Sequence, residues 1–259
     1  MKNKINNKLL TVVAILTGLL ITTNLFSQQG DLLNKVRDND IEGVKAALKA
    51  GADVNQVDDM MGYNALGLTS DIEMIKLLIS AGTDINHQDK RSAYTPLMSA
   101  LNGCKNDVAK ILIEKGADIN IKSNDGTTAL ILACGCSEEI ARQLLEKGAD
   151  IKAVTDKGMG VFTQCTGIGL SREAVSYEFA EFLLEKGANI DETNTTDYYG
   201  GYTPLFWAVE DNNKELVSFL VNHGANVNAR SNKGKTPLSI ANEAGYKEIA
   251  EILKSGGAK

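Results

Sequence analysis

The sequence has few aromatic residues and few prolines. Of its 259 residues only 5% are Phe, Trp or Tyr, and there are three prolines and one tryptophan. Hydrophobic residues still make up 43% of the chain, so a packed core can form, although large aromatic side chains contribute little to it. This composition suits short, closely stacked helices.

Histidine is scarcer still, and this argues against several kinds of chemistry. The two histidines, His87 and His223, lie far apart in the chain, so neither stands ready to activate a serine or cysteine nucleophile. The sequence Cys134-Gly135-Cys136 lacks the two-residue gap that is typical of structural zinc sites. Glycine fragments at 158–160 and 167–169 do not complete a phosphate loop. We therefore expect no catalytic, cofactor-binding or metal-binding residue, and two exposed histidines.

The first 27 residues resemble a secretory signal peptide. Three lysines precede an uncharged run from Leu9 to Ser27, which is the order of a charged n-region and an apolar h-region. An uncharged run of about 18 residues could also stay in a bilayer as an anchor. Polar residues such as Thr22, Thr23 and Asn24 dilute this run, which favours cleavage. We expect a bacterial protein that is periplasmic or secreted, with an N-terminal membrane anchor as the alternative.

Without its first 27 residues, the chain has fewer basic than acidic residues. The remaining chain has 24 basic and 33 acidic residues, a formal charge of −9. Nucleic acids and anionic membranes bind clusters of Lys and Arg that replace their counterions. The charge therefore argues against a nucleic-acid partner and against membrane binding beyond the leader, and leaves a protein partner.

A tripeptide close to Gly-Ala-Asp recurs along the chain. Its copies begin at Gly51, Gly82, Gly116, Gly148, Gly187 and Gly224. The steps between them are 31, 34, 32, 39 and 37 residues, a period near that of ankyrin repeats. Each glycine follows a helix-period apolar stripe and can adopt the left-handed conformation that ends a helix.

A second motif begins an inner helix in each unit. Thr-Pro-Leu stands at 95–97, 203–205 and 236–238, and weaker forms stand at 64–66 and 128–130. Threonine can cap a helix, and proline is tolerated at the first helical position because its missing N–H costs nothing there. Alanines follow in register and are small enough for neighbouring helices to approach closely: Ala100, Ala133, Ala208 and Ala241.

Together, Gly-x-Thr-Pro-Leu, the following Ala and Gly-Ala-Asp-Val-Asn resemble ankyrin repeats. The resemblance covers residues 28–259 and implies an all-α solenoid of about seven helix-turn-helix units with hairpin-like fingers, expected to be monomeric and to bind a protein partner. The expected unit boundaries are 28–58, 59–90, 91–123, 124–155, 156–194, 195–231 and 232–259.

The chain departs from the family pattern in several places. No repeat has the histidine that usually follows Thr-Pro-Leu, and the second unit is three residues shorter between its motif and its glycine than the third. The fifth unit lacks Thr-Pro-Leu and has extra residues around 167–176, and a long finger, 191–202, precedes the sixth. Insertions in solenoids often map to the binding face.

The candidate partner-binding residues are aromatic. On the family model the fingers and inner helices form the concave binding side, and Tyr and Trp are common interface anchors. The alternative is that three tyrosines brace the turns before the helices and that the tryptophan belongs to the core. The candidates are Tyr63, Tyr94, Tyr198, Tyr199, Tyr202 and Trp207.

Four cysteines lie on or just after inner helices of the third to fifth units. An even count in an oxidising compartment permits disulfides, and Cys134 with Cys165, or Cys104 with Cys136, are the candidate pairs. Packed helices lie about 8–10 Å apart, whereas a disulfide needs Cα atoms within about 7 Å. On this argument reduced, buried thiols are favoured over a disulfide.

Three functions remain. The leading hypothesis is an exported, non-enzymatic module that binds a protein partner. The second is a toxin-neutralising or enzyme-protecting accessory whose acidic surface masks a basic site. The third, and least favoured, is a cysteine-based redox protein.

Overall fold

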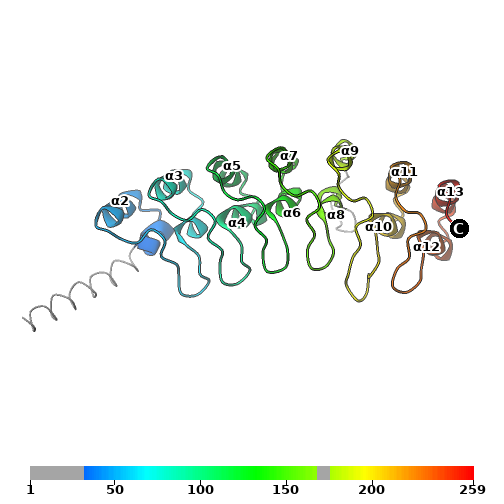
Figure 1. Cartoon of the computed structure of the whole chain (residues 1–259), viewed down its shortest axis with the longest axis horizontal. Coiled ribbons are helices and arrows are strands. Elements are labelled where there is room, and N and C mark those ends of the chain that lie inside the picture. The colour runs from blue at the N-terminus through cyan, green and yellow to red at the C-terminus, as the bar shows by residue number, and fades with distance from the viewer. Residues whose placement is uncertain (1–31, 168–175) are drawn as a thin grey trace, which may run out of the picture. The chain divides into compact units, whose positions relative to one another are not determined.

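The computed structural model describes residues 32–167 and 176–259 (Figure 1). The expected signal peptide and most of the extra residues of the fifth unit lie outside the described residues. Contacts between Cα atoms divide the chain into two compact units. One contains the described residues up to Ser99 with Glu114–Ala117, and the other contains Ala100–Ile113 with Asp118–Lys259.

The first unit consists of short helices, and long hairpin-like connections follow α2 and α3. Helical residues 32–37 are followed by α2 (Ile41–Lys49), the 3-10 helix η1 (Ala65–Leu68) and α3 (Ile72–Ser80). The second repeat, which the sequence shows to be three residues shorter than the third between its motif and its glycine, has an inner helix, η1, of only four residues. The Asn64 side chain caps η1 by accepting a hydrogen bond from the Gly67 amide.

The second unit repeats one pattern of an inner helix, a turn and an outer helix. The chain enters it within α4 (Pro96–Asn102). Its further helices are α5 (Asn106–Glu114), α6 (Ala129–Cys134), α7 (Glu138–Glu146), α8 (Val161–Thr166), α9 (Tyr177–Glu185), α10 (Pro204–Glu210), α11 (Lys214–Asn222), α12 (Pro237–Ala244) and α13 (Lys247–Ser255). Figure 1 shows α6, α8, α10 and α12 in one row and α7, α9, α11 and α13 in another.

Fingers connect each outer helix to the next inner helix. Those of the second unit are finger 1 (118–128), finger 2 (148–160), finger 3 (187–203) and finger 4 (224–236), and all project to the same side (Figure 1). The residues that the structure describes form no strand, only isolated bridges such as Val154 with Gly160. The glycine that follows each outer helix has φ between +85° and +93°, so the predicted left-handed helix end is confirmed.

The helix starts follow the predicted motifs. Helices α4, α10 and α12 begin at the proline of Thr-Pro-Leu, and α6 begins directly after Thr128, which caps it. Outer helices use other capping side chains, such as Ser137 for α7 and Asn213 for α11. Each cap satisfies an amide that has no partner within the helix.

The core lies between the two rows of helices and is largely aliphatic. Leu130, Leu144, Leu205 and Leu220 are fully buried. The alanines that the repeat places in register are also buried, with exposed fractions of 4% or less: Ala100, Ala133, Ala208 and Ala241. Small side chains here let neighbouring inner helices pack closely, as predicted.

An asparagine near the start of several fingers links one outer-helix end to the next. The Asn120 side chain donates to the Gly148 carbonyl at 3.2 Å and accepts from the Asp150 amide at 2.9 Å. Asn228 makes the same pair of bonds to Gly257 and Lys259, at 3.1 Å and 2.9 Å. The fifth residue of Gly-Ala-Asp-Val-Asn thus fastens successive repeats together.

Helix α8 begins irregularly because its repeat lacks Thr-Pro-Leu. Gly160 stands at its N-cap and offers no capping side chain. Glu192, from finger 3, takes that role by accepting from the Phe162 amide at 3.1 Å and the Thr163 amide and hydroxyl at 3.0 Å and 2.8 Å. A Cβ at 160 would lie 2.2 Å from a Glu192 carboxylate oxygen, so a larger residue there would displace Glu192 from this capping position.

No helix in the described part of the chain combines the length and the apolar character needed to cross a bilayer.

Candidate functional site

Five aromatic side chains gather where finger 3 meets α10. We call Tyr198, Tyr199, Tyr202, Phe206 and Trp207 the aromatic cluster. Ring centroids are 4.6 Å apart between Tyr198 and Tyr199, and 4.5 Å apart between Tyr199 and Trp207. Those of Tyr202 and Phe206 are 4.7 Å apart. These spacings are within the range of favourable edge-to-face and offset ring contacts.

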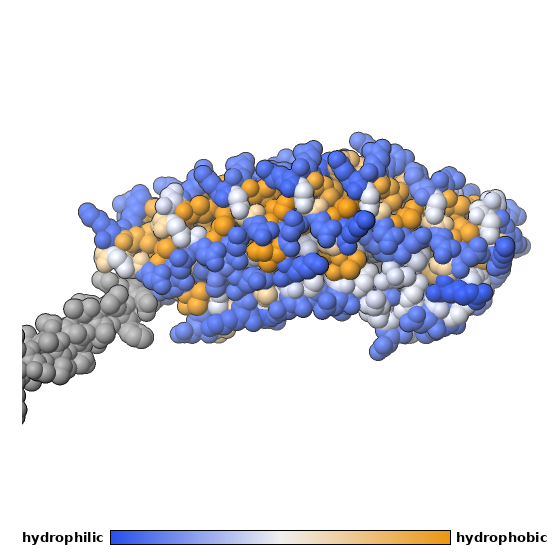
Figure 2. All heavy atoms as spheres, in the orientation of Figure 1, coloured by the Kyte–Doolittle hydropathy of each residue, from blue (hydrophilic) through white to orange (hydrophobic). Residues whose placement is uncertain are grey.

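The cluster runs from the core to the surface. Phe206 is fully buried and Tyr202 is 9% exposed, whereas Tyr199 and Trp207 are half-buried and Tyr198 is 67% exposed. Figure 2 shows a pale area, of hydropathy near the middle of the scale, over the finger that precedes α10. The bracing alternative therefore describes Tyr202, while Tyr198, Tyr199 and Trp207 leave ring surface accessible.

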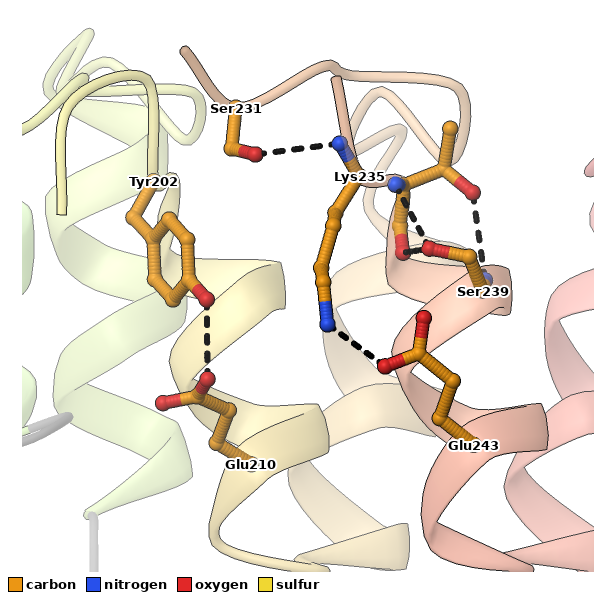
Figure 3. A network of polar contacts seen from close by, with 7 residues as sticks. Tyr202, Glu210, Ser231, Lys235, Ser239 and Glu243 are labelled. Carbon is orange, nitrogen blue, oxygen red and sulfur yellow. Dashed lines mark hydrogen bonds and ion pairs between the residues drawn. The ribbon is translucent and has the colours of Figure 1, made fainter. Parts of the chain in front are cut away.

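The inner edge of the cluster is fixed by a hydrogen bond to α10. The Tyr202 hydroxyl donates to the Glu210 carboxylate at 2.8 Å, and Figure 3 shows the tyrosine pointing along α10 toward it. Burial, and secondarily the bond to Glu210, raises the pKa of Tyr202, because both disfavour the phenolate. Tyr202 thus remains a hydrogen-bond donor at every physiological pH.

A parallel set of polar contacts orders the neighbouring finger 4 and α12. The Lys235 ammonium pairs with Glu243 at 2.5 Å, and the Lys235 amide donates to the Ser231 hydroxyl at 3.2 Å (Figure 3). Lys233, at the tip of finger 4, places its ammonium 3.9 Å from the Tyr198 ring centroid. The exposed tyrosine is thus held by a cation–π contact and still keeps most of its surface.

Two glycines bring finger 3 against finger 4. The Asn232 amide donates to the Gly200 carbonyl at 2.7 Å. Gly201 has φ +81°, and a Cβ there would lie 2.8 Å from the Arg230 carbonyl oxygen. Side chains other than glycine would force the fingers apart, so these positions fix where the aromatic cluster stands.

The predicted anchors Tyr63 and Tyr94 do not belong to the aromatic cluster. Both lie in the first unit and are half-buried. Tyr63 lines a surface cavity of about 830 Å³ together with Met60 and Asp58. The backbone amide of Tyr94 donates to the Asp89 carboxylate at 2.9 Å, inside its own finger turn. Their part in partner binding stays a prediction.

The preference for reduced thiols is wrong for this structure. Disulfides join Cys104 to Cys136 and Cys134 to Cys165, with Cα atoms 5.3 Å and 4.2 Å apart. The distance between helix axes did not predict the distance between these Cα atoms, because Cys134 and Cys165 stand on facing sides of α6 and α8, and Cys104 and Cys136 lie in the turns after the inner helices. All four cysteines are paired in these two disulfides.

Among the described residues, no group of three or more His, Cys, Asp or Glu side chains is placed to hold a metal ion. The expectation that His87 is simply exposed is wrong: it is half-buried, with Nε2 2.7 Å from the Gly62 carbonyl oxygen. His223 is exposed as expected, at the end of α11, and its Nε2 lies 3.7 Å from the Glu181 carboxylate.

Some residues that matter here were not predicted. Glu192 gave no signal, because a finger carboxylate that caps a helix of the preceding repeat has no sequence motif. Phe206 stands where the family usually has histidine and completes the aromatic cluster. Lys152 was visible as a departure, since it replaces the asparagine of Gly-Ala-Asp-Val-Asn.

Comparison with known proteins agrees with this architecture. A model of ankyrin repeats in three copies matches residues 32–122, 67–155 and 171–259. The putative ankyrin repeat protein YahD of Escherichia coli is 30% identical over 236 residues, which are 88% of this chain and 96% of that protein. An ankyrin repeat domain from Acinetobacter baumannii, of known crystal structure, shares 30% identity with a TM-score of 0.62, over 75% of this chain and 98% of that one.

The mouse B-cell lymphoma 3 protein homolog is 31% identical over 164 residues, which are 63% of this chain. The match spans only 36% of that relative's length. The chain belongs to the ankyrin-repeat family and has its all-α solenoid fold. Ankyrin repeats are protein–protein interaction modules.

Proposed function

We propose that this protein is an exported, non-enzymatic binding module that holds a protein partner on the face formed by its fingers and inner helices. The aromatic cluster is the observation that carries the proposal. It presents Tyr198, Tyr199 and Trp207 on a finger and helix that glycines and polar contacts hold in place. Rigid, partly exposed aromatic side chains anchor interfaces at a low entropic cost.

Export to the periplasm or beyond rests on the signal-like first 27 residues. The two disulfides support it, because such bonds persist in oxidising compartments and are rare in the cytosol. The excess of acidic residues argues against nucleic acid as the partner. We expect the module itself to be a monomer.

Substitution of the exposed anchors tests the proposed surface. Tyr198→Ala with Tyr199→Ala, and separately Trp207→Ala, should each reduce capture of the partner about tenfold or more, since truncated anchors cost about 2 kcal/mol. Capture is measured by co-purification from the native envelope fraction with quantitative mass spectrometry. Circular dichroism checks that each variant remains folded.

Tyr177→Ala is the matched control, because Tyr177 is an exposed tyrosine on the outer helix α9. Its capture should equal that of the wild type. Equal capture by the Tyr198/Tyr199 variant, the Trp207 variant and the control would remove the aromatic cluster from the binding account.

The acidic surface favours a second candidate, an accessory protein that masks a basic site on a toxin or enzyme. Interactions between exposed charges weaken as salt rises, whereas burial of aromatic rings does not. A loss of affinity of more than about tenfold between 0.05 M and 0.5 M salt would favour this candidate. A nearly salt-independent affinity would favour the aromatic anchor alone.

A further inference from the structure

The junction between the α6–α7 pair and the α8–α9 pair lacks the asparagine link that fastens its neighbour. Lys152 occupies the position in finger 2 that Asn120 occupies in finger 1. A lysine ammonium has no acceptor and cannot take a backbone N–H as Asn120 does. Among the described residues, Lys152 makes no side-chain hydrogen bond to Gly187 or Asn189, the counterparts of Gly148 and Asp150.

A disulfide spans this same junction. Cys134, the last residue of α6, is bonded to Cys165 near the end of α8. The other disulfide, Cys104 to Cys136, spans the preceding junction, between the α4–α5 pair and the α6–α7 pair. That junction also keeps both Asn120 bonds and an ion pair between Lys110 and Glu139 at 2.9 Å. The Cys104–Cys136 disulfide therefore reinforces a junction that other polar contacts also hold, whereas the Cys134–Cys165 disulfide spans a junction without the asparagine link.

Between the described residues, the other polar contacts at this junction are a cation–π contact and a backbone hydrogen bond. The Arg142 guanidinium on α7 lies 4.3 Å from the Phe182 ring centroid and 4.9 Å from that of Phe179, both on α9. The Asp156 amide donates to the Asp125 carbonyl at 2.8 Å near the finger tips. In addition, α8 depends for its cap on Glu192 from the following finger, so it loses this cap if the α8–α9 pair moves away from finger 3.

We propose that the Cys134–Cys165 disulfide is a redox-sensitive lock on the α8–α9 repeat, which takes over the task of the missing asparagine link. A dithiol reductant would open it: the S–S bond accepts two electrons and two protons to give two thiols, and the dithiol becomes a disulfide. The reduced junction then opens locally at α8 and α9, while the Asn120 junction stays closed. Finger 3 follows α9, so the aromatic cluster is the surface that this opening would reach.

Hydrogen exchange of the whole protein tests the lock without any partner. Backbone amides of α8 and α9 should exchange about tenfold faster or more after dithiothreitol reduction, because local opening sets their exchange rate. Amides of α5 and α7 should change by less than about threefold. Cys104→Ser with Cys136→Ser is the matched variant: it removes the other crosslink and should leave α8 and α9 as protected as in the oxidised wild type.

A second test of the proposed lock restores the asparagine link at this junction. In Lys152→Asn the new amide can donate to the Gly187 carbonyl and accept from the Asn189 amide, as Asn120 does with its own partners. Reduction of this variant should speed exchange at α8 and α9 by less than about threefold. Equal loss of protection at both junctions, global unfolding on reduction, or no rescue by Lys152→Asn would each overturn the proposal.

Discussion

At the scale of single residues, Glu192 is the most unusual side chain. It is a carboxyl group that is 5% exposed and pairs with no basic side chain in the described part of the chain, and three donors of α8 surround it. Burial raises the pKa of Glu192 above its ordinary value, and the hydrogen bonds from Thr163 and Phe162 only partly oppose this. The folded protein therefore holds this proton more tightly than the unfolded chain does.

The raised pKa predicts a stability change with a definite sign. Because the folded state binds the proton more tightly, Glu192 contributes stability that is lost as pH rises from the unfolded pKa through the folded one. Glu192→Gln cannot ionise, so the free energy of unfolding of the wild type should fall relative to this variant as the pH rises above the ordinary glutamate pKa of about 4.3. Urea denaturation at several pH values measures it, and a difference that is constant or of opposite sign would contradict the assignment.

At the scale of helices, α10 and α12 both begin with Thr-Pro-Leu but differ in how the threonine caps the helix. The Thr236 hydroxyl accepts a hydrogen bond from the Ser239 amide, and the Ser239 hydroxyl accepts one from the Thr236 amide, which forms a capping box at α12. Thr203 makes no cap bond at α10, and its buried hydroxyl has no hydrogen-bond partner among the residues that the structure describes. The sequence Thr-Pro-Leu is the same in both, so sequence alone assigns them equal roles.

This difference predicts unequal costs for one substitution. Thr236→Val should lower the free energy of unfolding by about 1 kcal/mol, because it removes a capping bond. Thr203→Val, which replaces an unsatisfied buried hydroxyl by a methyl group, should be neutral or slightly stabilising. Chemical denaturation of the two variants measures both values. A cost for Thr203→Val as large as that of Thr236→Val would show that its hydroxyl is satisfied in solution.

The regular repeats could be predicted from the sequence because their signals are local. Proline at the start of α10, and glycine after each outer helix, act through neighbouring backbone atoms. The irregular repeat could not be predicted in the same way. Gly160 and Glu192 meet across 32 residues, and the disulfide between Cys134 and Cys165 depends on which faces of α6 and α8 turn toward each other. The aromatic cluster was predicted only in part, since ring contacts depend on how finger 3 folds over α10.

At the scale of the whole molecule, the irregular features of the second unit lie close together along the chain. The missing asparagine link, the Cys134–Cys165 disulfide and the borrowed cap of α8 all precede the long finger that carries the aromatic cluster. Repeat proteins are held together by contacts between neighbouring repeats, so a weakened junction affects its own neighbours first. The proposed lock and the proposed binding surface are therefore adjacent but can be tested separately.

Site-specific photo-crosslinking in the native cell tests the binding claim most directly. A photoreactive amino acid replaces Tyr198 on finger 3 in one variant and Tyr177 on α9 in another, and mass spectrometry identifies what each one captures. The account predicts that position 198 crosslinks one envelope protein in high yield and that position 177 does not. Equal crosslinking from both positions, or no protein crosslinked from position 198, would contradict it.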